Sequence, residues 1–248
     1  MADYIALEVP DGEAEAYVTG TAGPGVLLYM DAIGLRPQIE RMADRIASWG
    51  YVVLAPNVFW RDGSVEDLAP RSDLRVPENR EAFMASGVMD RVRSISADVV
   101  CADAEEWIDA LRGIGGAADG PIATTGYCFG GRLALRTAAH LPDDVAVVGM
   151  FHTGGIVTDA PDSPHLDLPG AATFVLAGHA DADRSNSPEQ IEAFDGALDA
   201  AGVPRRTAVY PGAVHGYTMA DTAAYDESSA ERHYDELREA LDRALKSS

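Results

Sequence analysis

A cysteine stands in a short glycine-rich motif, Gly126-Tyr-Cys-Phe-Gly-Gly131. The apolar run Pro121–Thr125 before it is typical of a buried strand, and the segment Arg132–His140 after it has the periodicity of a helix. Cys128 is therefore predicted at a sharp strand-to-helix turn, the arrangement called a nucleophile elbow, with a thiol where serine is usual. Small glycines on both sides give such a turn the room that it needs.

The helix that follows would favour a thiolate at Cys128, because free backbone N–H groups and the positive end of the helix dipole point at the sulfur. A thiolate at this place is a nucleophile. The alternative is that Cys128 is an inert buried side chain, since free cysteines are among the residues most often buried. The motif alone leaves both interpretations open, so its partner residues matter.

A nucleophilic thiol needs a base that takes its proton and a third group that orients the base. An acidic turn, Gly178–Asp183, follows one apolar strand, and His215 lies on a glycine-flanked loop after the next strand. Taken singly, the carboxylates could be solvated loop residues or helix caps, and the histidine a surface residue. The order along the chain predicts a triad of Cys128, Asp181 and His215.

The other histidines have weaker patterns. His152 follows the apolar segment Val145–Phe151 and could line the mouth of a pocket. His179 precedes Asp181 and could also face the site. His233 lies in a charged helical segment and is interpreted as part of an exposed helix face.

Eight β-like segments alternate with helical patterns, which is the signature of a mostly parallel sheet covered by helices on both faces. Strands are predicted near Tyr4–Val9, Ala14–Thr19, Val26–Met30, Tyr51–Ala55, Pro121–Gly126, Val145–Phe151, Thr173–Ala177 and Arg206–Tyr210. Helices are predicted near Pro37–Trp49, Ala97–Arg112, Arg132–His140, Glu189–Ala201 and Ala224–Leu245. We expect one domain over residues 1–248. An irregular segment at about 57–96, with a short helix around Glu78–Met89, could cover the active site.

The chain has 248 residues and a formal charge of −21, from 40 acidic and 19 basic residues. This charge argues against nucleic acid and anionic membranes as partners, and an anionic substrate would need arginines placed locally in the pocket. With no long apolar stretch, no signal segment and only two cysteines, we expect a cytoplasmic protein, monomeric or a small homo-oligomer. Neither a C-x-x-C nor an H-E-x-x-H pattern occurs, so no metal or other cofactor is expected.

The sequence resembles the dienelactone hydrolase family of α/β-hydrolases, which includes carboxymethylenebutenolidase. The resemblance covers most of the chain and rests on the cysteine motif, the turn Gly178–Asp181, the loop Gly212–Gly216, and Tyr29–Gly34 followed by Gly50–Pro56. It implies the α/β-hydrolase fold and the hydrolysis of a small ester or lactone without a cofactor.

The resemblance also implies roles for single residues. Cys128 would attack the carbonyl and form an acyl-enzyme thioester, His215 would shuttle the proton, and Asp181 would orient the imidazole. The backbone N–H groups of Phe129 and Ala32 would hold the oxyanion.

Two positions depart from the family. Asp31 stands where the family normally has a glutamate that contacts the resting thiol, so its reach is one methylene shorter; it could instead bond nearby backbone. Met219 stands where dienelactone-cleaving members have an arginine that binds the substrate carboxylate, and Arg80 is a candidate for the second such arginine. These departures predict a less anionic ester or lactone than dienelactone.

Other functions remain open from the sequence. The same scaffold could transfer the acyl group to an acceptor other than water. It could also bind a small ligand without catalysis, with Cys128 merely packed. A redox sensor at Cys128 would lack a resolving cysteine.

Overall fold

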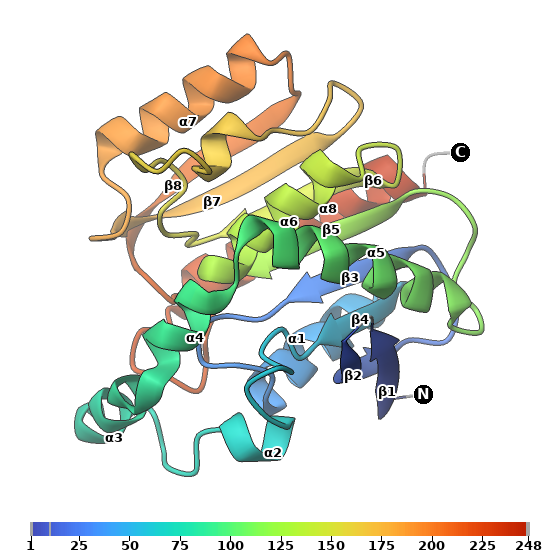
Figure 1. Ribbon diagram of the computed structural model, residues 1–248. Coiled ribbons are helices and arrows are strands. Elements are labelled where there is room, and N and C mark those ends of the chain that lie inside the picture. Colours follow the sequence, from blue (N-terminus) through green and yellow to red (C-terminus); the bar gives the residue numbers. More distant parts are fainter. Residues whose placement is uncertain (1, 10, 247–248) are drawn as a thin grey trace.

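A computed structural model describes residues 2–9 and 11–246 of the chain (Figure 1). Its strands form one sheet in the order β1-β2-β4-β3-β5-β6-β7-β8. The strands are β1 (Asp3–Val9), β2 (Gly12–Thr19), β3 (Gly25–Tyr29), β4 (Val52–Pro56), β5 (Ile122–Tyr127), β6 (Val145–Phe151), β7 (Phe174–Ala182) and β8 (Arg205–Val214). β2 is antiparallel to β1 and β4, and all other neighbours are parallel.

Helices cover both faces of this sheet, which confirms the predicted architecture. Figure 1 shows α5 (Ala97–Gly113) and α6 (Phe129–His140) in front of the sheet, and α1 (Pro37–Ala47) and α8 (Glu227–Leu245) behind it. A 2.5 Å ion pair between Arg45 and Glu231 joins α1 to α8. The remaining long helix, α7 (Pro188–Ala200), follows the loop after β7.

The central strands are buried along their whole length. Every residue of β3, β4 and β5 is buried, because parallel strands with helices on both faces have no side that meets water. Tyr29 in β3 packs edge-to-face on Trp107 of α5, with ring centroids 5.7 Å apart, and its hydroxyl lies 2.6 Å from Thr137 Oγ1 of α6. The strand ends that carry the site are thus held on a rigid support.

The two C-terminal strands are longer than predicted. β7 runs to Ala182 and β8 runs to Val214, against the predicted ends at Ala177 and Tyr210. The pairing of β7 with β8 becomes irregular between Ala180 and Ala182. Because β7 is longer than predicted, the polar turn after it begins several residues later in the chain. This shift changes which acidic residue stands at the end of the strand.

The irregular segment between β4 and α5 contains α2 (Val65–Leu68), α3 (Pro77–Phe83), a π-helical turn η1 (Met84–Val88) and α4 (Met89–Ser94). The single short helix predicted around Glu78–Met89 is therefore two helices with a kink at Gly87, whose φ is 95°. The segment packs on the molecule through Phe59, which stacks on Phe129 with ring centroids 5.4 Å apart. Because Phe129 is the first residue of α6, this contact joins the segment to the start of the helix that follows Cys128.

None of the helices in the described part of the chain is both long and apolar enough to cross a lipid bilayer.

Candidate active site

Cys128 occupies the strand-to-helix turn that the sequence predicts. Its backbone has φ 57° and ψ −123°, and its N–H donates to the carbonyl of Phe151 over 3.1 Å. Glycines make this turn possible, because a Cβ at Gly126 would meet the carbonyl oxygen of Gly130, and a Cβ at Gly130 would meet that of Met30. The backbone therefore presents the thiol at the crest of a strained turn.

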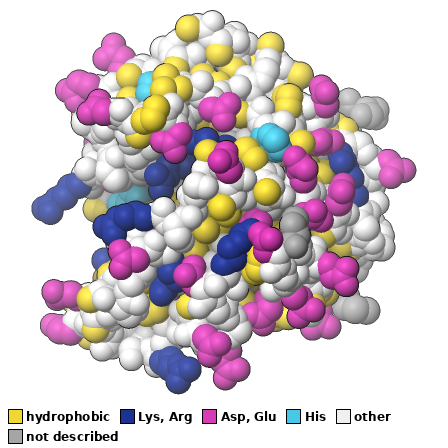
Figure 2. All heavy atoms as spheres, viewed as in Figure 1, with side chains coloured by type: hydrophobic (Ala, Val, Ile, Leu, Met, Phe, Trp, Pro, Cys, Tyr) yellow, Lys and Arg dark blue, Asp and Glu magenta, His cyan; other side chains and the backbone are white. Residues whose placement is uncertain are grey.

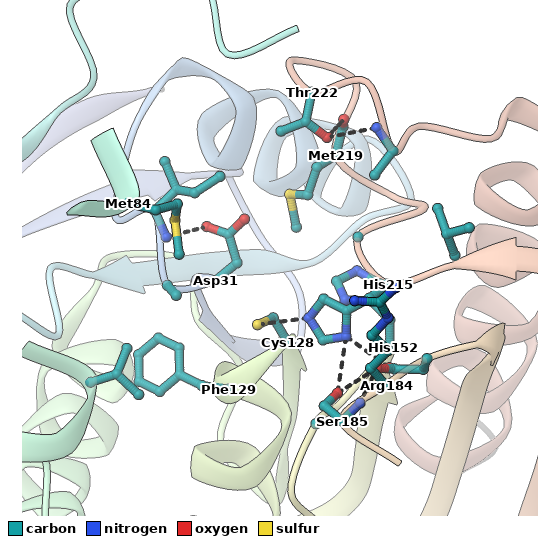
Figure 3. A pocket seen from close by; sticks show the side chains of 18 of the residues that line it. Asp31, Met84, Cys128, Phe129, His152, Arg184, Ser185, His215, Met219 and Thr222 are labelled. Atoms are coloured by element: carbon teal, nitrogen blue, oxygen red, sulfur yellow. Dashed lines mark hydrogen bonds and ion pairs between the residues drawn. The ribbon is translucent and has the colours of Figure 1, made fainter. Parts of the chain in front are cut away.

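His215 lies beside the thiol and contacts an aspartate on its other side (Figure 3). Its Nε2 is 3.1 Å from Cys128 Sγ, and its Nδ1 is 2.7 Å from Asp183 Oδ2. His215 follows directly after β8, and Asp183 follows directly after β7. The three side chains form a continuous chain from carboxylate to imidazole to sulfur.

The prediction that Asp181 contacts His215 is wrong; Asp183 takes this place. The exposed Asp181 accepts a hydrogen bond from the backbone N–H of Gly212 over 2.9 Å, across the β7–β8 pairing. Because β7 continues through Ala182, Asp181 still belongs to the strand, and Asp183 is the first acidic residue past its end. The sequence shows both carboxylates in one turn, but it does not show where the strand stops.

Asp183 is held by hydrogen bonds on both oxygens. Its Oδ1 accepts from the backbone N–H of Ser185 over 2.8 Å and from its hydroxyl over 2.5 Å, while Oδ2 faces His215. Only 2% of the Asp183 side chain is exposed. Burial alone would raise the pKa of this carboxyl, but the hydrogen bond and charge of His215, together with the hydrogen bonds from Ser185, outweigh it and lower the pKa. Asp183 is therefore ionised and fixed in orientation.

The charge state of His215 follows from the same contacts. Burial alone would lower the pKa of the imidazole, but the hydrogen bonds to Asp183 and Cys128 outweigh it and raise the pKa to about 10. A protonated His215 donates a proton on each side, toward the carboxylate and toward the sulfur. Both ring protons of an imidazolium at His215 therefore have acceptors, Asp183 Oδ2 and Cys128 Sγ.

His152 forms a buried wall behind His215. Its backbone is left-handed, with φ 39°, and its ring centroid lies 5.3 Å from that of His215. Nε2 is 2.7 Å from Thr218 Oγ1, and Nδ1 has no hydrogen-bond partner among the described residues. Burial lowers the pKa of His152 well below its usual value, so the ring is neutral. It lines the cavity, which its position after a strand had suggested.

Asp31 makes a different contact from the one that the family resemblance implied. Its Oδ1 lies 2.6 Å from Arg36 Nη1 and accepts the backbone N–H of Ile33 over 3.1 Å. The same buried arginine pairs with Asp221 over 2.6 Å. No hydrogen bond joins Asp31 to Cys128 among the residues that the structure describes, and Figure 3 shows the carboxylate apart from the thiol. Nothing in the sequence pattern had pointed to Arg36.

The thiol opens into a cavity of about 580 Å³. Apolar side chains of Ile33, Met84, Met89 and Val92 line one part of it, so the segment between β4 and α5 does contribute to the site. Of the site residues predicted from the sequence, those that line the cavity are Asp31, Ala32, Arg80, Cys128, Phe129 and His215. Met219 also lines it, and its sulfur is 3.5 Å from Arg36 Nη2.

Two other histidines lie outside the cavity lining. His233 is fully buried against Tyr127, Phe151 and Tyr234, and burial lowers its pKa to about 3, so its predicted place on an exposed helix face is wrong. His179 is buried and packs on Phe194. Within residues 2–9 and 11–246, no three His, Cys, Asp or Glu side chains are grouped as a metal site would require.

Comparison with known proteins identifies the family. The profile of the dienelactone hydrolase family matches residues 14–245. The chain belongs to this family. It is 26% identical over 213 residues to the carboxymethylenebutenolidase of Rhodococcus opacus, covering 86% of this chain and 77% of that protein. Members of the dienelactone hydrolase family hydrolyse esters and lactones, and this chain is such a hydrolase.

Solved structures show the same fold. A dienelactone hydrolase-like promiscuous phosphotriesterase from metagenomic libraries superposes with a TM-score of 0.75 at 18% identity, covering 99% of this chain and 98% of that one. An esterase of Pyrobaculum calidifontis superposes with a TM-score of 0.67 at 17% identity, covering 99% and 86%. The chain has the α/β-hydrolase fold.

Proposed function

We propose that the protein hydrolyses a small ester or lactone with Cys128 as the nucleophile. The observation that supports this most directly is the chain of hydrogen bonds from Asp183 through His215 to Cys128 Sγ, which ends in the cavity. An inert packed cysteine would need neither a basic partner nor an opening to a cavity of this size.

In the first step the thiolate attacks the substrate carbonyl carbon. A C–S bond forms, and the electron pair of the C=O bond moves to the oxygen, which becomes an oxyanion. The backbone N–H groups of Phe129 and Ala32 would stabilise it. Phe129 is the first residue of α6, so its N–H is free of helical hydrogen bonds, and none to the N–H of Ala32 is found within the described residues.

The tetrahedral intermediate then collapses. The C–O bond to the leaving alcohol breaks, and His215 Nε2 gives its proton to the departing oxygen. The product of this step is a thioester on Cys128 and a neutral imidazole. For a lactone, the alcohol stays part of the acyl group through its carbon chain, and the product released by water is a hydroxy acid.

Water completes the cycle. His215 takes a proton from a water molecule, the hydroxide attacks the thioester carbon, and the C–S bond breaks. The carboxylic acid leaves, and the thiolate and imidazolium are restored. Asp183 keeps Nδ1–H of His215 directed at its carboxylate throughout, so that Nε2 always faces the reacting atoms.

The resting thiol in this arrangement is already paired with its base. Arg36 holds Asp31 away from Cys128, and the sulfur is 3.1 Å from His215 Nε2. The proposed mechanism therefore requires no movement of Asp31 when substrate arrives.

A panel of small esters and lactones, assayed with wild type, Cys128→Ala and Cys101→Ala, tests this function. Cys101 lies on α5, and burial raises the pKa of its thiol, so it serves as the matched control. We expect Cys128→Ala to lose turnover and Cys101→Ala to retain it. Wild-type rates in Cys128→Ala would refute the proposed nucleophile, while an inactive but ligand-binding wild type would indicate a binding protein.

A further inference from the structure

One arginine of the cavity wall carries a charge that no described carboxylate pairs. Arg132 lies on α6, one helical turn after Cys128, and lines the same cavity. No hydrogen bond or ion pair to its guanidinium is found among the described residues, and its Nε is buried without a partner. Burial lowers the pKa of Arg132 from its ordinary value, but an arginine stays charged at neutral pH.

The carboxylates of the cavity do not neutralise Arg132. Asp31 is paired with Arg36, and Asp183 with His215. Cys128, when it is a thiolate, and more weakly Asp162 act on Arg132 through space, but neither is hydrogen-bonded to it, and the sulfur is already bound by His215. The next arginine on the helix shows the contrast, because Arg136 donates to the carbonyl of Asp162 over 2.7 Å and pairs with Asp167 at 3.7 Å.

A largely buried charge without a counter-ion destabilises a folded protein unless something compensates for it. The unpaired positive charge of Arg132 is a local feature, because the chain as a whole has a formal charge of −21. Figure 2 shows most of the basic side chains of this face in its left half, with others at the right edge, while acidic ones are spread across it. Two further arginines line the cavity, Arg80 and Arg184, but both are exposed and are therefore screened by solvent.

We propose that Arg132 binds a carboxylate of the substrate, so that the preferred substrate is a small ester or lactone with one negative charge away from the scissile bond. This inference rests on the proposed hydrolase function. A carboxylate fits better than a phosphate, because the planar guanidinium can donate two parallel hydrogen bonds to it. Among the described cations of the cavity wall, Arg132 alone is both largely buried and unpaired, which matches a single negative charge.

The inference reverses the expectation of a less anionic substrate. That expectation came from Met219, an uncharged residue at the position where dienelactone-cleaving members of the family have an arginine. Arg36 does not replace it, since Asp31 and Asp221 already occupy its guanidinium. Arg132 supplies a free cation from α6, and the long-range repulsion of an acidic protein would then be overcome locally.

Two phenyl esters of matched shape test the proposal. The phenyl half-ester of glutaric acid carries a free carboxylate, and phenyl 5-methylhexanoate replaces it with an isopropyl group. We expect Arg132→Gln to lower kcat/KM for the half-ester roughly 10- to 100-fold, from the loss of a charged hydrogen bond, mainly through KM. The neutral ester should change little. Arg136→Gln, on the same helix, should leave the ratio of the two esters as in wild type.

A binding measurement separates this proposal from the catalytic one. Calorimetric titration of Cys128→Ala with monomethyl glutarate should show binding that Arg132→Gln, added to that variant, removes. Binding that is retained after Arg132→Gln is added would overturn the carboxylate site. An equal loss of activity of Arg132→Gln on both esters would also overturn it, and would assign Arg132 to thiolate stabilisation or to folding. A wild type with no preference for the half-ester would overturn it as well. Loss of turnover in Cys128→Ala is judged separately and bears only on the nucleophile.

Discussion

Replacing Asp183 with asparagine removes the charge that orients His215 and keeps the shape of the side chain. In the structure the carboxylate accepts Nδ1–H of His215 over 2.7 Å and is fixed by Ser185 on its other oxygen. Asparagine can present its NH₂ group to Nδ1, and the imidazole would then adopt the other tautomer or turn away from the thiol. The pKa of His215 would fall, because a main cause of its rise to about 10 is the hydrogen bond to Asp183.

The expected loss of activity in Asp183→Asn follows from the kind of hydrogen bond that the substitution removes. A hydrogen bond to a charged group contributes about 1.5–3 kcal/mol, which corresponds to a fall in kcat/KM of roughly 10- to 150-fold. The larger loss of about 10⁴-fold known for the equivalent change in a serine triad is an upper bound, because here the thiolate also holds His215 in place.

Asp181→Asn is the matched control. Asp181 is exposed and accepts only the N–H of Gly212 among the described hydrogen bonds, a bond that an amide oxygen can also accept. Surface changes of this kind alter free energies by about 0.5 kcal/mol or less, so its activity should stay within about twofold of wild type. Steady-state hydrolysis of an activated phenyl ester, with circular dichroism to confirm folding, measures both variants. A larger loss in Asp181→Asn than in Asp183→Asn would refute the geometry described above.

Further predictions concern pH, the turn and the wall of the site. The pKa of His215 is raised from 6.5 to about 10 on folding. The stabilisation from its charged contacts is therefore fully present below pH 6.5 and is lost as the pH rises through 10. The difference in Tm between wild type and His215→Gln should shrink over this range, and a constant difference would contradict the assigned contacts. Gly126→Ala should lower the free energy of unfolding by about 1–3 kcal/mol in urea denaturation, because its Cβ meets the backbone of α6; unchanged stability would mean that the turn is not close-packed. In His152→Asn the new asparagine can adopt the left-handed backbone, but the ring beside His215 is lost. We expect kcat to fall about 2- to 12-fold, from the loss of about 0.5–1.5 kcal/mol of ring packing, with KM unchanged. If His152 had a purely structural role, only Tm would fall. Iodoacetamide should label Cys128 faster than Cys101 near neutral pH, and equal labelling would argue against an activated thiolate.

The sequence predicts the elements that carry the site because their signals are local. Cys128 follows the fully buried strand β5, whose residues form the nearly continuous apolar run typical of a parallel strand covered on both faces. His215 stands on a glycine-flanked loop at the end of β8, a strand that is mostly exposed or half-buried, so its signal is the loop motif. The sheet was predictable for the same reason, and β6 has the predicted bounds.

Other features depend on contacts between distant parts of the chain. The choice of Asp183 over Asp181 depends on where β7 ends, and this end is set by its pairing with β8. Arg36 meets Asp221 across 185 residues of sequence, and no periodicity predicts that pair. The burial of His233 depends on rings from β5 and β6, so its charged neighbours in the sequence were misleading.

An acyl group carried on Cys128 during turnover can be trapped by a rapid-quench experiment. The protein is mixed with a phenyl ester and quenched in acid within one turnover, and its peptides are analysed by mass spectrometry. We expect the acyl mass on the peptide that contains Cys128, as a thioester that hydroxylamine cleaves, and no such adduct in Cys128→Ala. An acyl group on another residue, or turnover that persists without Cys128, would contradict this expectation.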